Sequence, residues 1–185
     1  MNKIYDKIRK CIIPDSEIIQ DIEHAKRNDP YFDINNVIYG SWSSLIIQKR
    51  EELIEYLLAD PNINVNYEDW NGYTALHCAY NIPNLKLLLG HKNIEVNIQN
   101  KYGWTVLHRE CYNNHIEIIK ILLLDSRINI IIRNNERKTA QDYAILKGHL
   151  GIANMLKRTG RTSLLRIPNK MLCWDITRMI IEEYV

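Results

Sequence analysis

The side chains of this sequence that could do chemistry are its histidines and cysteines. His77 and His108 each close a run of the same type, Thr-Ala-Leu-His and Thr-Val-Leu-His. Histidine is the commonest metal ligand and a frequent acid–base catalyst. Two others, His115 and His149, have no Asp, Glu or Cys beside them at the spacing of a zinc site. The chain also lacks the glycine-rich phosphate loop and the nucleophile elbow. We therefore expect no enzyme, no metal and no cofactor.

The four cysteines, Cys11, Cys78, Cys111 and Cys173, are far apart and include no C-x-x-C pair. This pattern favours buried thiols in a reducing compartment, so we expect a cytoplasmic protein. The formal net charge of the 185 residues is only +2, whereas nucleic-acid-binding domains usually carry a strongly basic face. The N-terminus lacks the apolar segment of a signal peptide, and no uncharged apolar run reaches the roughly 18 residues of a membrane span. Neither nucleic acid nor a membrane is an expected partner.

The first two histidines belong to an internal repeat. Gly72–His77 and Gly103–His108 match each other, and a weaker copy begins at Arg137. The threonines of the three copies recur at spacings of 31 and then 34, and counting back 31 from the first reaches Ser43, which opens a degraded copy. Glycine at the start of a copy supplies the positive φ of a tight turn. The threonine two residues later is a typical helix N-cap.

A second marker runs in the same register and completes the repeat. Ile63–Asn66, Ile94–Asn97 and Ile128–Ile131 follow one another at the same two spacings as the threonines. The segment His115–Leu123 places isoleucine and leucine at helical spacing, and shorter first helices are predicted at Ala75–Tyr80 and Val106–Asn113. Each repeat therefore predicts a tight turn, a short first helix, an apolar second helix and an extended polar segment. One repeat cannot bury its apolar face alone, so the repeats must stack.

These motifs resemble the ankyrin repeat family closely. Thr74–His77 and Thr105–His108 are similar to the family's T-P-L-H box, without its proline, and Asn114–Leu123 to its second-helix run. The resemblance implies an all-α ankyrin-repeat solenoid of helix-turn-helix units joined by β-hairpin-like loops. It also implies that the box histidines are structural and hydrogen-bond between the turns of adjacent repeats.

The resemblance divides the chain into three parts. Residues 37–158 are expected to be ankyrin repeats, residues 1–36 a degenerate N-terminal capping repeat, and residues 159–185 a linker and a C-terminal amphipathic helix. In the first part, Asp15 or Ser16 is expected to cap a helix. Two departures from the family pattern predict irregularities. The repeat after Thr74 is about three residues short near Asn81, which predicts clipped helices, and Arg137 in place of the turn glycine predicts a distorted last hairpin.

The C-terminal segment allows two interpretations. Leu172, Ile176, Met179 and Ile180 fall on one helical face, so the segment could fold back and cap the last repeat. Alternatively, Leu172–Ile176 is similar to the start of the F-box-like segments that end ankyrin proteins of poxviruses and other large DNA viruses. That resemblance implies a substrate adaptor that docks a ubiquitin-ligase adaptor protein through residues 167–185.

A series of aromatic residues gives the most specific functional hypothesis. Trp42, Tyr73 and Trp104, followed by Lys138, each precede the box threonine or its equivalent, at spacings of 31, 31 and 34. In ankyrin proteins the hairpin positions around the turn glycine face the binding surface, and large aromatic residues anchor protein interfaces. The chain is therefore predicted to bind a partner protein through its concave hairpin side, as a monomer. The predicted partner-binding residues are Trp42, Trp70, Tyr73, Lys101, Tyr102, Trp104 and Lys138.

Overall fold

The computed structural model describes residue 4 and residues 13–35 and 50–164. The chain divides into two compact units, Met1–Glu95 and Val96–Val185, which are described separately. Throughout these described residues every regular element is a helix, as expected for a helical repeat fold. Trp42, Cys11, Cys173 and residues 165–185 lie outside the described residues, whereas residues 159–164, expected to begin a linker, are helical.

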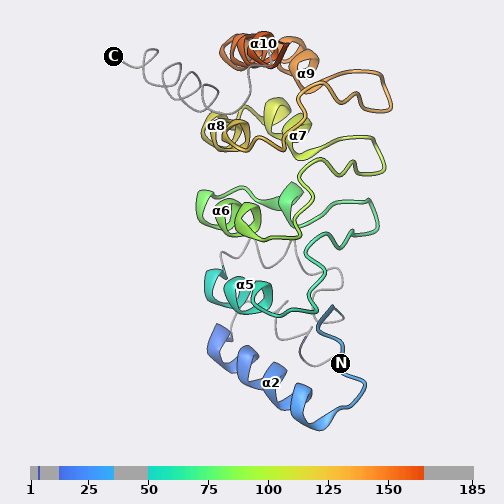
Figure 1. Cartoon of the computed structure of the whole chain (residues 1–185), viewed down its shortest axis with the longest axis vertical. Helices are drawn as coiled ribbons and strands as arrows, with labels where there is room; N and C mark the ends of the chain where they lie inside the picture. Colours follow the sequence, from blue (N-terminus) through green and yellow to red (C-terminus); the bar gives the residue numbers. More distant parts are fainter. Residues whose placement is uncertain (1–3, 5–12, 36–49, 165–185) are drawn as a thin grey trace. The chain divides into compact units, whose positions relative to one another are not determined.

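In the first unit, three α-helices and one short 3-10 helix are described: α2 (Asp15–Asn28), α5 (Glu51–Leu58), η1 (Leu76–Cys78) and α6 (Ile82–Gly90). Helix α2 packs against α5, and α5 against α6 (Figure 1). The contacts are made by apolar residues three or four positions apart, which form one face of each helix. The buried members of this core are Ile18, Ile22, Leu53, Ile54, Leu57, Leu85 and Leu88.

The second unit contains two helix pairs: α7 (Val106–Asn113) with α8 (Ile116–Leu124), and α9 (Ala140–Leu146) with α10 (Leu150–Leu164). Helix α7 packs against both α8 and α9, and α9 packs against α10. A residue with positive φ joins the helices of each pair, Asn114 at 62° and Gly148 at 78°. The predicted helix-turn-helix units are therefore present, and the predicted bounds of α7 are confirmed.

Threonine caps the first helix of both pairs. Thr105 accepts a hydrogen bond from the backbone N–H of His108, while Thr139 accepts one from that of Asp142. In each case the second side chain accepts in return from the backbone N–H of the threonine, which completes a capping box. Thr74 does not cap an α-helix in this way, because η1 is only one short 3-10 turn. The clipping predicted for this shortened repeat is confirmed.

Three tight turns share one hydrogen-bond pattern. The backbone N–H groups of Asp69, Asn100 and Asn134 each donate to the carbonyl oxygen of the residue four positions later, and the donor–acceptor distance is 2.9 Å in all three turns. The fourth residue of each turn has positive φ: Gly72 (77°), Gly103 (74°) and Arg137 (62°). The prediction of a distorted last hairpin is therefore wrong, since Arg137 adopts the left-handed conformation and its N–H donates to the carbonyl oxygen of Asn134 (2.8 Å), as the N–H of Gly103 does to that of Asn100 (2.8 Å).

The first residue of each turn is an Asp or Asn whose role in the turn was not predicted. Its Oδ1 atom accepts from two N–H groups of the turn, at positions two and four residues later, with distances of 2.8–3.0 Å. An Asx side chain that binds its own backbone in this way favours a turn. The side chains are Asp69, Asn100 and Asn134, whose spacings of 31 and 34 follow the repeat.

A second set of asparagines ties each extended segment to the next. In the second unit, Asn97 donates to the carbonyl oxygen of Arg127 (2.7 Å) and accepts from the N–H of Asn129 (2.8 Å). In the first unit, Asn66 makes the corresponding bonds to Asn93 and Glu95. Asn35 makes them to residues 62 and 64, so residues 29–35 connect to the following segment as a repeat does.

Helix α2 begins differently from the prediction. Its N-cap is Pro14, with no side-chain cap hydrogen bond, so the expected cap by Asp15 or Ser16 is wrong. The Asp15 carboxylate instead accepts from the Arg50 guanidinium (2.7 Å) and from the backbone N–H of Leu53 (3.2 Å). Asp15 therefore satisfies an N–H group in the first turn of α5, which has no cap of its own from Arg50.

Candidate protein-binding surface

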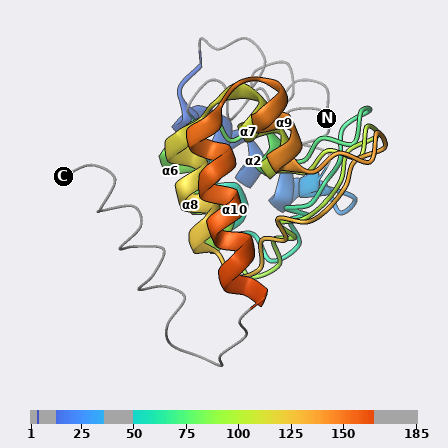
Figure 2. The same cartoon turned by 90° about the horizontal axis from the view of Figure 1, so that it is seen from above.

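The second unit places its two tight turns next to each other. The backbone N–H of Asn135 donates to the carbonyl oxygen of Tyr102 (3.2 Å), and its side chain donates to that of Lys101 (2.9 Å). Seen from above, the loops of this unit project beside its helices rather than over them (Figure 2). We call residues 99–104 and 133–138, with the adjoining first helices α7 and α9, the hairpin surface of the second unit.

The predicted partner-binding residues differ in exposure. Trp70 and Tyr102, at the tips of their turns, are 74% and 57% exposed, whereas Tyr73 and Trp104, which precede the box threonines, are half-buried. The Tyr73 ring packs edge-on against His77, at 5.6 Å between ring centres. The exposed aromatic groups therefore sit at the turn tips, and the box positions point partly into the fold.

Trp104 belongs to an aromatic cluster within the second unit. Its ring lies 4.7 Å from that of Tyr143 and 5.2 Å from that of Tyr112, measured between ring centres. Tyr143 is buried on α9, whereas Tyr112, near the end of α7, is 36% exposed. Tyr112 and Tyr143 were not predicted as site residues, and no repeat marker distinguishes them. The cluster joins the turn at Trp104 to both first helices.

Two lysines lie against this cluster. The Lys147 ammonium is 4.0 Å from the centre of the Tyr112 ring, and that of Lys138 is 5.5 Å from the centre of the Tyr143 ring. Ammonium groups over aromatic faces are attracted by the ring quadrupole. Lys138 also forms an ion pair with Glu136 (2.8 Å). This hydrogen bond raises the pKa of Lys138 and lowers the pKa of Glu136, so both stay charged at neutral pH.

His108 is a structural residue. Its Nε2–H donates to the carbonyl oxygen of Lys138 (3.1 Å), and its Nδ1 atom accepts from the N–H of Thr105 (3.2 Å). Burial lowers the pKa of His108, in agreement with the neutral ring that these two bonds require. The bond to Lys138 confirms that this box histidine links its repeat to the turn of the next. No ring nitrogen is left to bind a metal or to accept a proton.

His77 and the two described cysteines are buried within the fold. His77 is buried, and its Nδ1 atom accepts from the N–H of Thr74 (3.2 Å). Cys78 and Cys111 are buried free thiols, as predicted, and burial raises the pKa of Cys111. In the part of the chain that the structure describes, no group of three or more His, Cys, Asp or Glu side chains could hold a metal ion.

Glu110 is the one carboxylate buried in the second unit's first helices. It occupies the register position of Ala79 and Ala144, which are buried alanines. One oxygen is 2.5 Å from His115 Nδ1, and the other has no hydrogen-bond partner among the described residues. Burial, opposed by His115, raises the pKa of Glu110. A buried carboxylate with one unpaired oxygen is costly in its charged form.

This position predicts a pH effect on stability. Because the folded pKa of Glu110 is raised, its favourable contribution is complete below the unfolded value of 4.5 and is lost as the pH rises through the folded pKa. We expect Glu110 to lower the free energy of unfolding as the pH rises from 4.5 through its folded pKa, and Glu110→Ala to remove that contribution to the slope. Urea denaturation across the range measures it, with Glu117→Ala, an exposed carboxylate on α8, as control. Equal slopes in all three proteins would refute the assignment.

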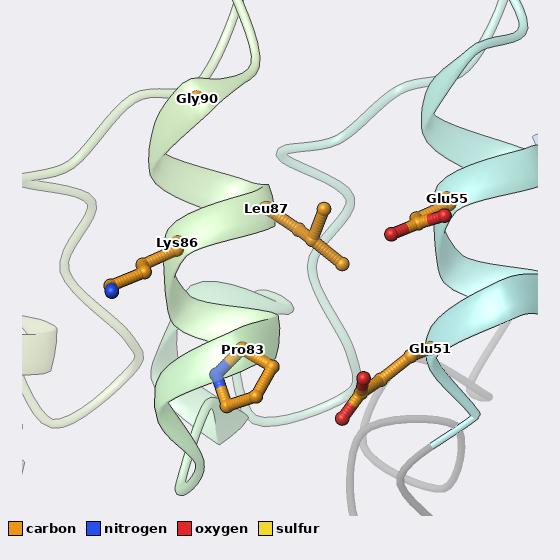
Figure 3. A pocket seen from close by; sticks show the side chains of 6 residues that line it. All are labelled: Glu51, Glu55, Pro83, Lys86, Leu87 and Gly90. Atoms are coloured by element: carbon orange, nitrogen blue, oxygen red, sulfur yellow. The ribbon is translucent and has the colours of Figure 1, made fainter.

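One depression in the first unit is a weaker candidate site. It lies between α5 and α6 and is lined by Glu51, Glu55, Pro83, Lys86, Leu87 and Gly90. Figure 3 shows the two carboxylates on α5 facing Leu87 and Pro83, while Lys86 points away from them. Two carboxylates one helical turn apart are too few for a metal site, and the depression is open to solvent.

Comparison with known proteins agrees with this architecture. A family model of ankyrin repeats in three copies matches residues 80–163. No curated protein matches the chain. Together with the helix pairs and turns above, the match shows that the chain contains ankyrin repeats, which generally mediate protein–protein interactions. It does not support the viral or the F-box resemblance. Among the described residues, no helix is both long and apolar enough to cross a membrane.

Proposed function

We propose that this chain is a binding module, not an enzyme, and that it captures a partner protein through its hairpins. The observation that carries the proposal is the exposure of Trp70 and Tyr102. Each is a large aromatic side chain at the tip of a turn that is fixed by an Asx residue and a positive-φ glycine. A rigid, exposed aromatic side chain loses little entropy on binding and is typical of interface hot spots.

The architecture supports the same conclusion. Within the second unit, stacked repeats hold two turns beside α7 and α9, each of which begins with a capping box, so the side chains at these turn tips are preorganised. Of the predicted residues, Trp70, Lys101, Tyr102 and Lys138 remain the proposed contacts. Tyr73 and Trp104 are proposed to contribute through the exposed parts of their rings. Trp42 stays a prediction from the sequence.

Alanine substitution at the turn tips tests the proposal. Trp70→Ala and Tyr102→Ala should each weaken capture of the partner by about 30-fold, equivalent to roughly 2 kcal/mol for one hot-spot aromatic residue. The double variant should weaken capture at least as much. Capture from cell lysate followed by quantitative mass spectrometry measures the loss, and circular dichroism checks that the helices persist.

A matched control is available in Tyr31, an aromatic residue that is 86% exposed in the loop after α2 and outside the tight turns. Tyr31→Ala should leave capture unchanged. If Tyr31→Ala abolished capture and the turn-tip variants did not, the binding surface would lie elsewhere. The same assay on a chain truncated after residue 164 tests the remaining sequence prediction, recruitment of a ubiquitin-ligase adaptor through residues 167–185, which lie outside the described part.

A further inference from the structure

We infer that the hairpin surface of the second unit receives an acidic segment of the partner, a peptide whose Asp or Glu side chains flank an apolar residue. This inference rests on the proposed function and specifies the chemistry of the partner. It follows from the charges that remain uncompensated on the surface, from the aromatic groups among them, and from the distribution of charge along the chain.

The two carboxylates of this surface that reach solvent are already paired. Glu136 binds Lys138 at 2.8 Å, and Asp142 lies 3.9 Å from Arg133. Three exposed cations form no ion pair with any described carboxylate: Lys101 and Arg137 on the surface, and Lys147, which directly follows α9. The uncompensated charge of the surface is therefore positive, and complementary charge is what steers a partner and fixes its orientation.

Aromatic groups lie among these cations. Lys147 is held over the Tyr112 ring, which in turn contacts Trp104, and Tyr102 is exposed beside Lys101 on the turn. Carboxylates of a bound segment can therefore pair with the ammonium groups while an apolar side chain between them packs on an aromatic ring. Both kinds of contact are available within the second unit alone.

The second unit carries a net positive formal charge and the first unit a net negative one. Residues 96–185 contain 14 Lys and Arg against 8 Asp and Glu, whereas residues 1–95 contain 10 against 14. An acidic peptide is therefore attracted to the second unit and repelled by the first. Nucleic acid fits less well, because its backbone carries a phosphate at every nucleotide and would meet Glu136 and Asp142 on the surface. The hydrogen bond from Lys138 lowers the pKa of Glu136, and the hydrogen bond from the Thr139 backbone lowers the pKa of Asp142. Both carboxylates therefore stay charged at neutral pH.

Fluorescence anisotropy on the full chain tests the inference. The probes are a short labelled peptide in which glutamate and aspartate alternate with leucine, its lysine-substituted counterpart, and a single-stranded oligouridylate. We expect the acidic peptide to bind, more weakly as salt rises because exposed charges are screened, and the other two not to bind. Absence of acidic-peptide binding, or tighter binding of the oligouridylate, would overturn the inference.

Matched charge reversals locate the site. Lys101→Glu with Lys147→Glu should weaken acidic-peptide binding roughly tenfold or more, because like charges then face each other. Lys92→Glu with Lys157→Glu changes the net charge equally, at two exposed lysines outside the surface, and should have little effect. Equal losses in both double variants would show non-specific attraction and overturn the inference. If the captured partner is lost on Tyr102→Ala but kept by Lys101→Glu with Lys147→Glu, the proposed function stands and the acidic partner is wrong.

Discussion

Gly103→Ala should lower the free energy of unfolding of the second unit by about 3 kcal/mol. Gly103 has φ +74°, a conformation that costs roughly 1–2 kcal/mol for a residue with a Cβ atom. An added Cβ would also lie 2.6 Å from the backbone nitrogen of Asn135 and 2.9 Å from Cα of Asn134. These are backbone atoms of the neighbouring turn, which cannot move aside alone, so overpacking adds about 1–3 kcal/mol. Urea denaturation followed by circular dichroism measures the loss.

Two other glycines separate these two effects. Gly148 has φ +78° but nothing within 4 Å of an added Cβ, so Gly148→Ala should show the conformational cost alone. Gly90, the last residue of α6, has no positive φ, and no atom lies within 4 Å of an added Cβ, so Gly90→Ala should be neutral or slightly stabilising. A loss for Gly103→Ala no larger than that for Gly148→Ala would mean that the two turns are not packed as closely as described.

Arg50→Ala should destabilise the first unit by about 3–5 kcal/mol, as expected when one partner of a buried ion pair is removed. Arg50 and Asp15 are only 7% and 15% exposed, and their closest atoms are 2.7 Å apart. Arg50 also donates to the carbonyl oxygen of Ile13 (3.1 Å). Without Arg50, the Asp15 carboxylate between α2 and α5 keeps a hydrogen bond to Leu53 but loses its counterion. The change is measured as the midpoint of thermal or urea unfolding.

Two comparisons identify the cause. Arg127→Ala removes an ion pair with Asp125 of similar length, 2.6 Å, but Arg127 is 43% exposed, so the loss should stay below about 1 kcal/mol. Asp15→Asn with Arg50→Met removes both charges and should recover much of the stability lost in Arg50→Ala. If the double variant were as unstable as Arg50→Ala, lost packing rather than an unpaired charge would be responsible.

The sequence was sufficient to predict what depends on local periodicity. The register of the repeat located the turns and the capping threonines, and isoleucine at helical spacing located α8. The shortening after Thr74 predicted a clipped helix, and η1 confirms it. These predictions succeed because a capping box, a positive-φ turn and an apolar helix face are each decided within a few residues.

The features that were missed depend on residues far apart in the chain. Asp15 accepts hydrogen bonds from Arg50 and Leu53 and does not cap its own helix, and nothing near Asp15 in the sequence indicates these partners. Arg137 was expected to distort its turn because glycine is favoured at positive φ. The bonds of Asn134 and the neighbouring turn instead hold the backbone in place. The bridging asparagines of the extended segments did carry a signal, since they recur in the register of the repeat, but their role as bridges is visible only in three dimensions.

For the candidate surface, the sequence placed the aromatic residues in the correct register but could not rank their exposure. A position one residue before the box threonine and a position at the turn tip both contain aromatic side chains. Only the fold shows that Trp104 turns toward Tyr143, whereas Tyr102 faces solvent. The cluster with Tyr112 and Lys147 depends on the packing of α7 against α9, two helices that are separated in the sequence by a whole second helix and a turn.

If the hairpins bind the partner, hydrogen–deuterium exchange of the chain should slow at the tight turns 69–73, 100–104 and 134–138 when the captured partner is present, with little change in α6 and α8. Protection confined to the second helices α6, α8 and α10, with the turns unchanged, would contradict partner binding through the hairpins.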